Sequence, residues 1–186
     1  MKLIKFIHLA TIVSAALLTL SPSAARAEEK PTTQLIRNGS FQDALQNWEL
    51  QQIEPAKGDL SIVQEGPEGS RCAKVTLLTP ADEHWKMSLF QTGLSVKAAK
   101  TYKITFMAKG SEQRWVSVDF KQHLEPYTGL GGKYDVEIGT TWTQVTLTIK
   151  PTADEPNTRF SIGNLGINKG TLWFTNFSIT EEPAAP

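Results

Sequence analysis

Side chains able to do acid–base chemistry gather in one short segment of the chain. Asp82, Glu83 and His84 are consecutive residues in a polar stretch that Pro80 opens. From a strand the two carboxylates would point to opposite faces, whereas from a loop both could face one ligand. Further carboxylates are dispersed, at Glu112, Asp119 and Glu125. Hydrolysis of a glycosidic bond needs two carboxyl groups roughly 5–10 Å apart across a cleft. No spacing here indicates such a pair, so we interpret these groups as solvated surface residues.

Metal-binding and nucleophile motifs are absent from the sequence. His84 and His123 are the histidines after residue 27, and neither has the spacing of a metal ligand. There is no Gly-x-Ser-x-Gly elbow and no phosphate-binding loop. Cys72 is the only cysteine, and its place in a strand-like run predicts a buried, inert thiol without an intramolecular disulfide. These observations predict a protein that is not an enzyme and requires no cofactor.

Two tryptophans in polar surroundings are the stronger chemical signal. Over residues 115–120, apolar even positions alternate with Trp115, Ser117 and Asp119. Period-2 alternation puts this second set on the face opposite the core, so Trp115 is either a binding residue or covered by a neighbouring loop. Trp85 has the same two interpretations, because it follows His84 in a loop and loops on a rigid sheet often carry binding residues.

The chain that must position these residues has the period of β-strands. Over residues 102–109 apolar side chains alternate with largely polar ones, and three strand-like runs fall between residues 67 and 110. About ten strands are predicted, with further runs at 35–37, 48–53, 60–63, 115–120, 134–138, 143–149, 159–162 and 172–179. Residues 122–133 are predicted to be a glycine-rich loop, and no helical period lasts three turns. This pattern predicts an all-β fold, a two-sheet β-sandwich or jelly roll.

The N-terminus has the features of a secretory signal peptide. Lys2 and Lys5 precede an apolar run over 9–20, and residues 25–27 form a small-x-small cleavage site. The alternative is an uncleaved membrane anchor, but the run is short for a bilayer span and Pro22 follows it. Cleavage after residue 27 predicts a secreted or periplasmic protein with no membrane span.

Cleavage would leave enough chain for one domain. Removing 27 of 186 residues leaves 186 − 27 = 159, and a domain of that size buries roughly 70% of its unfolded surface. We predict a signal peptide over 1–27, a short linker over 28–34, a β-sandwich domain over 35–181 and a loose tail over 182–186. The 19 basic and 19 acidic residues give a formal charge of +0, so we expect no strong attraction to nucleic acid or anionic lipid.

The order of several motifs resembles that of the carbohydrate-binding modules of families 4, 9 and 22. The matching stretches are residues 35–41 (Leu-Ile-Arg-Asn-Gly-Ser-Phe) with Trp48, 69–75, 85–91, 96–102 running into 106–109, 141–145 and 172–179. Together they cover nearly the whole predicted domain, and it is their order that makes the resemblance specific. The resemblance implies a galactose-binding-domain-like jelly roll that binds carbohydrate and is often attached to glycoside hydrolases.

The resemblance also implies a structural calcium ion between the first and last strands. In the family, an acid follows the Asn-Gly-x-Phe motif and paired aspartates lie in the last strand. Here those places are taken by Gln42, Thr175 and Asn176, which are neutral, whereas Ca²⁺ prefers anionic oxygens. Gln42 and Asn176 are therefore interpreted as a degenerate calcium position with Asp43 adjacent, and we expect weak or absent calcium binding.

Aromatic residues suit carbohydrate binding, because sugar rings stack their C–H faces on aromatic planes while polar groups bond the hydroxyls. The resemblance places Trp48, Trp142 and Trp173 at framework positions, and we predict that they lie in the core. The predicted sugar site consists of Trp85, Trp115, Tyr127 and Tyr134, with Arg71, His84, Asp119, Gln122 and His123 as hydrogen-bonding partners. Trp115 and Asp119 would lie on the outer face of one sheet, between the loops that carry Trp85 and Tyr127.

We therefore predict an exported, non-catalytic protein that binds an oligo- or polysaccharide, a plant-type or other β-linked glycan, through aromatic stacking. One alternative is an accessory part of a glycoside hydrolase system, with a separate hydrolase as partner. The other is a structural or adhesion module without sugar affinity. The neutral calcium position keeps that second alternative open, as does Ser88, where the family often has Gln.

Overall fold

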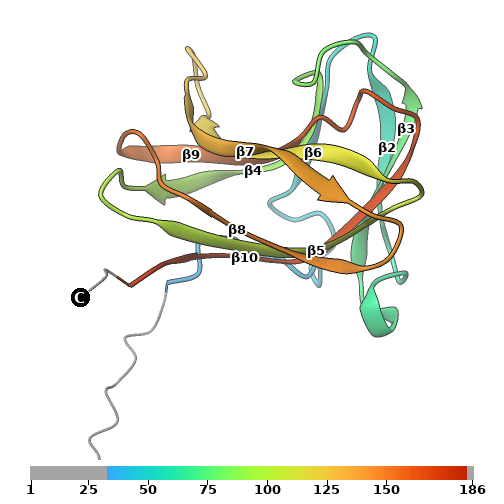
Figure 1. The fold of residues 1–186 in the computed structure, drawn as a ribbon, viewed down its shortest axis with the longest axis horizontal. Helices are drawn as coiled ribbons and strands as arrows, with labels where there is room; N and C mark the ends of the chain where they lie inside the picture. The colour runs from blue at the N-terminus through green and yellow to red at the C-terminus, as the bar shows by residue number, and fades with distance from the viewer. Residues whose placement is uncertain (1–32, 184–186) are drawn as a thin grey trace, which may run out of the picture. The chain divides into compact units, whose positions relative to one another are not determined.

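Two five-stranded sheets face each other across a hydrophobic core (Figure 1). The structure, a computed structural model, describes residues 33–183. One sheet has the strand order β1-β4-β9-β6-β7 and is called the β6 sheet; the other has the order β2-β3-β10-β5-β8 and is called the β10 sheet. All strand pairs are antiparallel. The predicted all-β jelly-roll sandwich is confirmed.

The strand bounds show that each sheet is assembled from distant parts of the chain. The β6 sheet comprises β1 (Glu49–Gln52), β4 (Met87–Val96), β9 (Glu155–Gly163), β6 (Arg114–Gln122) and β7 (Gly129–Ile138). The β10 sheet comprises β2 (Lys57–Val63), β3 (Cys72–Thr79), β10 (Gly170–Glu181), β5 (Tyr102–Gly110) and β8 (Thr143–Ile149). A single 3-10 turn, η1 (Pro67–Gly69), separates β2 from β3 within the described chain. About ten strands were predicted and ten are present, but the predicted strand over 35–37 is not among them.

Alternation along the strands directs one set of side chains into the core. On β5, Tyr102, Ile104 and Phe106 are buried, as the period-2 pattern predicts. Aromatic rings meet at the centre of the sandwich, where the Phe177 ring centroid lies 5.1 Å from that of Phe106 and 4.6 Å from that of Trp48. Trp48 is therefore a core residue, as predicted.

The predicted loop over 122–133 is wrong in its second half, because β7 begins at Gly129. Gly132 pairs with Asp119 on β6. A Cβ atom at Gly132 would lie 2.8 Å from the Val118 carbonyl oxygen, so the close approach of the two backbones requires glycine there. The glycines that give the segment a loop-like composition are thus compatible with strand pairing.

Trp142 and Trp173 lie outside the core, which corrects the prediction. Both are half-buried on the outer side of the β10 sheet, where Lys109 Nζ lies 5.3 Å from the Trp142 ring and 4.7 Å from the Trp173 ring. Trp173 Nε1 donates to a carboxylate oxygen of Glu65 at 2.8 Å, and Trp142 Nε1 donates to the Glu65 carbonyl at 3.2 Å. Trp173 faces outward because it alternates with two buried residues of β10.

Both ends of the described chain are joined to the sandwich. Gln34, which we predicted to be linker, forms an isolated bridge with Thr180. Glu182, which we predicted to begin the loose tail, donates its backbone N–H to the Thr101 carbonyl at 2.8 Å. The sheet therefore extends by about one residue past the predicted boundary at each end, which is the usual uncertainty of element boundaries.

Some predictions fall outside the described residues, namely the signal peptide over 1–27, most of the linker and residues 184–186 of the tail. Within residues 33–183, no helix is long and apolar enough to cross a membrane. Cys72 is fully buried on β3, and burial raises the pKa of its thiol, as expected for an inert cysteine.

Candidate functional site

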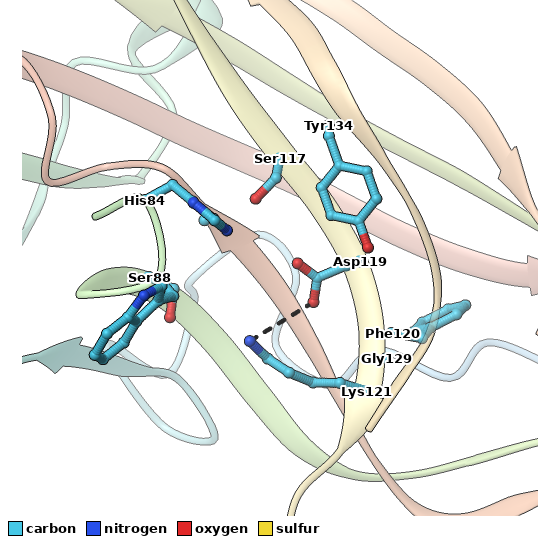
Figure 2. Close-up of a pocket in the computed structure, with 10 residues that line it drawn as sticks. His84, Ser88, Ser117, Asp119, Phe120, Lys121, Gly129 and Tyr134 are labelled. Carbon is cyan, nitrogen blue, oxygen red and sulfur yellow. Dashed lines mark ion pairs between the residues drawn. The ribbon is translucent and has the colours of Figure 1, made fainter. Parts of the chain in front are cut away.

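A pocket lies on the outer face of the β6 sheet, the face turned away from the core (Figure 2). Its lining comes from the loop before β4, from β4, β6 and β7, and from the end of β9. The ten lining residues are His84, Trp85, Ser88, Ser117, Asp119, Phe120, Lys121, Gly129, Tyr134 and Gly163.

Strand β6 forms the floor of the pocket. Alternation buries the apolar residues at 116, 118 and 120 in the core and leaves Ser117, Asp119 and Lys121 on the outer face. Three of the residues paired with this row are glycines: Gly163 opposite Ser117 on β9, and Gly132 and Gly129 opposite Asp119 and Lys121 on β7. A Cβ atom at Gly163 would lie 2.5 Å from Ser117 Oγ. The missing side chains leave the sheet face hollow beside the polar row.

Asp119 and Lys121 form a loose and largely buried ion pair on this floor. Lys121 Nζ lies 4.0 Å from Asp119 Oδ1, and the side chains are only 23% and 13% exposed (Figure 2). Asp119 Oδ1 has no hydrogen-bond partner within the described part of the chain. Burial raises the pKa of the Asp119 carboxyl, against the opposing effect of Lys121, and burial also lowers the pKa of Lys121. A buried acceptor without a partner is uncommon and is available to a ligand.

Arg159 on β9 supports the floor from the side of β4 and is 7% exposed. Its guanidinium carbon lies 3.7 Å from the centroid of the Phe90 ring. It donates to Ser161 Oγ at 3.1 Å, to Gln51 Oε1 at 2.7 Å and to Ser88 Oγ at 2.5 Å. These bonds hold β1, β4 and β9 together, and all three acceptors are uncharged. Burial lowers the pKa of Arg159.

Two aromatic side chains stand on either side of the polar floor. Trp85 is 47% exposed in the loop between β3 and β4, and Tyr134 is 63% exposed on β7. The Trp85 loop is fixed by two hydrogen bonds, from the Asn164 N–H to the His84 carbonyl and from Gln51 Nε2 to the Trp85 carbonyl, both at 2.9 Å. The loop that carries Trp85 along one side of the pocket is therefore fixed in position, which suits a binding role.

Four predicted site residues are brought together in the lining: His84, Trp85, Asp119 and Tyr134. Trp115 lies on the same face of β6, two positions before Ser117, but outside the lining. Its side chain is 50% exposed, as the alternation predicts. It adds an exposed aromatic surface to the sheet face that carries the pocket.

The other predicted residues lie away from the lining. Tyr127 is 56% exposed in the loop between β6 and β7. Gln122, at the end of β6, donates to a glutamate carboxylate of β9 at 3.0 Å. His123 Nδ1 is buried with no hydrogen-bond partner in the described chain. Arg71 precedes β3 in the other sheet, so the structure does not bring it to this site.

Our sequence reasoning missed seven residues of the site: Arg159 and six residues of the lining, namely Ser88, Ser117, Phe120, Lys121, Gly129 and Gly163. The alternation that identified Asp119 continues to Lys121, so a signal for that residue was present. Arg159 and Gly163 had no such signal, because β9 pairs with β6 although two other strands lie between them in the chain.

The calcium position that the resemblance implies does not fit a divalent cation. Arg71 Nη1 donates to the Gln42 carbonyl at 2.6 Å, and Thr175 Oγ1 donates to the Arg71 carbonyl at 2.7 Å. The guanidinium thus brings a positive charge to residues that would have to coordinate the ion, whereas Ca²⁺ prefers carboxylates. Asn176, with φ 55°, adds only a neutral amide. Among residues 33–183, no group of three or more His, Cys, Asp or Glu could hold a metal ion.

The pocket combines a polar floor with aromatic surfaces, which suits a ligand with apolar faces and hydroxyl groups. Lys121, Ser88 and Ser117 carry hydrogen-bond donors, and Asp119 carries the unpartnered acceptor. Asp119 is also the one carboxylate among the ten lining residues.

Comparison with known proteins gives a family match over most of the chain. The family model described as a carbohydrate binding domain, of the 4/9 type, matches residues 33–163. No curated protein gives a significant match. A CBM4 structure is similar over 79% of this chain and 99% of its own length, with 23% sequence identity and a TM-score of 0.68.

Two solved structures from Clostridium thermocellum are also similar. The family 11 carbohydrate-binding module in complex with a β-1,3-1,4-mixed-linked tetrasaccharide has a TM-score of 0.54 and 13% identity, over 80% of this chain and 94% of that one. The CBM22-1–GH10 modules of endo-1,4-β-D-xylanase 10B, complexed with xylohexaose, have a TM-score of 0.57 and 15% identity, over 82% of this chain and 29% of that one. At these identities the likeness shows the shared fold.

Proposed function

The chain belongs to the carbohydrate-binding domain family of the 4/9 type, and from this we propose that it binds an oligo- or polysaccharide in the pocket on the β6 sheet. The observation that supports this site is the hollow polar floor between exposed aromatic side chains. Sugar C–H faces would pack on Trp85, Trp115 and Tyr134. Sugar hydroxyls would donate to Asp119 Oδ1 and accept from Lys121.

The ligand class we propose is a β-linked glycan. Two modules with the same sandwich architecture hold a β-1,3-1,4-mixed-linked tetrasaccharide and xylohexaose, respectively. An exported protein would meet such polysaccharides outside the cell, and the N-terminal apolar run with its small-x-small site supports export. A separate glycoside hydrolase is the partner we propose, because two of the similar structures are parts of such enzymes.

We propose that the domain binds its glycan without cleaving it. Glycosidases use a pair of carboxyl groups, and Asp119 stands alone among the lining residues in having one. Purified protein should therefore release no reducing ends from xylan, β-glucan or mannan. Sustained release that disappears in Asp119→Asn would overturn this part of the proposal.

A glycan array with the purified domain, residues 28–186, tests the binding function. Gly129 pairs with Lys121 and so faces the pocket, and a Cβ atom there would meet nothing within 4 Å. Gly129→Leu should fill the pocket without disturbing the fold. Gly139, which also has free space around a Cβ atom, follows β7 outside the lining and gives the matched control, Gly139→Leu.

We expect the parent and Gly139→Leu to bind the same glycans and Gly129→Leu to lose them. Retained binding in Gly129→Leu would place the sugar elsewhere. Absence of binding by the parent to any arrayed glycan would favour a structural or adhesion module instead.

A further inference from the structure

The floor of the pocket holds more positive than negative charge. Lys121 and Arg159 are both mostly buried, and Asp119 is the buried carboxylate that attracts both. Arg159 uses its hydrogen bonds on uncharged acceptors. Lys121 is 4.0 Å from Asp119 Oδ1, which is too long for a hydrogen bond. The two cations therefore share one buried counter-charge, which is loosely placed.

Acids near the rim do not correct this imbalance. Glu83 is paired with Lys86 at 2.8 Å, and Glu137 accepts a hydrogen bond from Gln113 at 2.5 Å. Glu49, on the edge strand β1, also attracts Arg159, but it is exposed, so water weakens this attraction. A buried ammonium without a close anion is unfavourable, and the lowered pKa of Lys121 has the same cause.

Resting on the proposed function, we propose that the glycan bound here carries carboxylate groups, so that its units include uronic acids. The uronate carboxylate would accept a charge-assisted hydrogen bond from Lys121 Nζ, which is turned into the pocket (Figure 2). A neighbouring sugar hydroxyl would donate to the unpartnered Asp119 Oδ1. The ligand thus supplies the negative charge and the donor that the floor lacks.

The ligand carboxylate can be removed chemically while the sugar chain is kept. Glucuronoxylan, polygalacturonate and alginate would each be titrated beside their carboxyl-reduced derivatives, with unsubstituted xylan and β-glucan as neutral ligands. We expect at least one acidic polysaccharide to bind about tenfold or more tightly than its reduced form, because one charge-assisted hydrogen bond supplies such a factor. The preference should shrink as salt rises.

Variants of Lys121 test whether this residue binds the carboxylate of the glycan. Lys121→Met should abolish the preference for the acidic form, and Lys121→Arg should retain it. Lys133→Met is the control, because Lys133 lies on β7 outside the lining, is 57% exposed and pairs with Asp135. Melting curves would confirm that each variant is folded.

The outcomes separate the two proposals. Equal binding of acidic and reduced glycans, or a preference that survives in Lys121→Met, would overturn the uronate inference while leaving carbohydrate binding intact. Failure of every glycan to bind would overturn the proposed function itself.

Discussion

Asp119 is the residue whose placement is hardest to explain by folding alone. Its carboxylate is largely buried, one oxygen has no hydrogen-bond partner in the described chain, and its cationic neighbour is 4.0 Å away. An unsatisfied buried acceptor destabilises a fold by roughly 1–3 kcal/mol. Residues that destabilise the free protein and face a pocket are candidates for function. We therefore expect stability and binding to respond in opposite directions when Asp119 is changed.

Replacing Asp119 by Asn should remove a pH-dependent loss of stability. The folded-state pKa of Asp119 is raised by burial, so between the unfolded and folded pKa values the folded protein keeps a proton that the unfolded chain releases. Stability contributed by the protonated form is therefore lost as pH rises through this window. Between pH 4 and 8, the melting temperature of Asp119→Asn should rise relative to that of the parent as pH increases.

Asp135→Asn is the control for this titration. Asp135 is exposed, and a hydrogen bond from Lys133 lowers its pKa, so its contribution to stability grows as pH rises from acid. The melting temperature of Asp135→Asn should therefore fall relative to that of the parent over the same pH range. If the melting temperatures of Asp119→Asn and the parent differed by the same amount at all pH values, the raised pKa assigned to Asp119 would be wrong.

The exposed tryptophans should contribute to binding and little to stability. Truncating an aromatic side chain at a binding hot spot costs about 2 kcal/mol or more, which is roughly a 30-fold loss of affinity. Trp85→Ala and Trp115→Ala should each show such a loss in isothermal titration with a glycan identified by the array. Their melting temperatures should change little, because the side chains are 47% and 50% exposed.

Trp142→Ala serves as the comparison, since Trp142 lies by the other sheet. If Trp115→Ala binds like the parent while Trp85→Ala does not, the site is restricted to the pocket lining. If both bind like the parent, aromatic stacking on this face is wrong.

At the scale of strands, local patterns were sufficient where the signal is period-2 alternation. The faces of β5 and β6 follow directly from it, which is why Trp115 and Asp119 were placed correctly. The same rule would have placed Trp173 outside the core, because it alternates with buried residues of β10. Our prediction failed there because the framework position that the resemblance implies was given more weight than position in the strand.

Trp142 should therefore matter less to stability than a core tryptophan. Trp48 is 3% exposed and packs on Phe177, so Trp48→Ala should cost about 3–5 kcal/mol. Trp142 contributes one hydrogen bond to Glu65 and one contact with Lys109, which together amount to about 1–2 kcal/mol. Chemical denaturation of the two variants measures the difference directly. A loss in Trp142→Ala equal to that in Trp48→Ala would show that the outer cluster is as important as the core.

For the whole molecule, the sequence predicts the fold class better than it predicts the site. Ten short strands with turns between them lead to a sandwich by elementary packing rules. The site depends on the strand order β1-β4-β9-β6-β7, which joins distant segments. No local pattern encodes that order, so Arg159 and Gly163 could not be assigned to the floor beforehand. The resemblance to a family supplied the outer sheet face as the place to look, and the residues themselves supplied Asp119 and Trp85.

Arg71 joins the loop that carries Gln42 to the last strand, β10, where the resemblance implies a calcium ion. This is the long-range contact that differs most from what the resemblance implies. Arg71 donates a hydrogen bond to the Gln42 carbonyl, and its own carbonyl accepts one from Thr175 on β10.

A bound ion would stabilise the fold by RT ln(1 + [L]/Kd), about 2.7 kcal/mol at a hundredfold excess over Kd. We expect millimolar Ca²⁺ to leave the melting temperature nearly unchanged, and Arg71→Ala to lower the free energy of unfolding by about 1 kcal/mol through its lost hydrogen bond. Lys74→Ala, which removes a cation from the adjoining strand β3 without touching this contact, is the matched control. A large upward shift of the parent with Ca²⁺ that a chelator reverses would show that carbonyl oxygens and Asp43 build a working calcium site despite the nearby guanidinium.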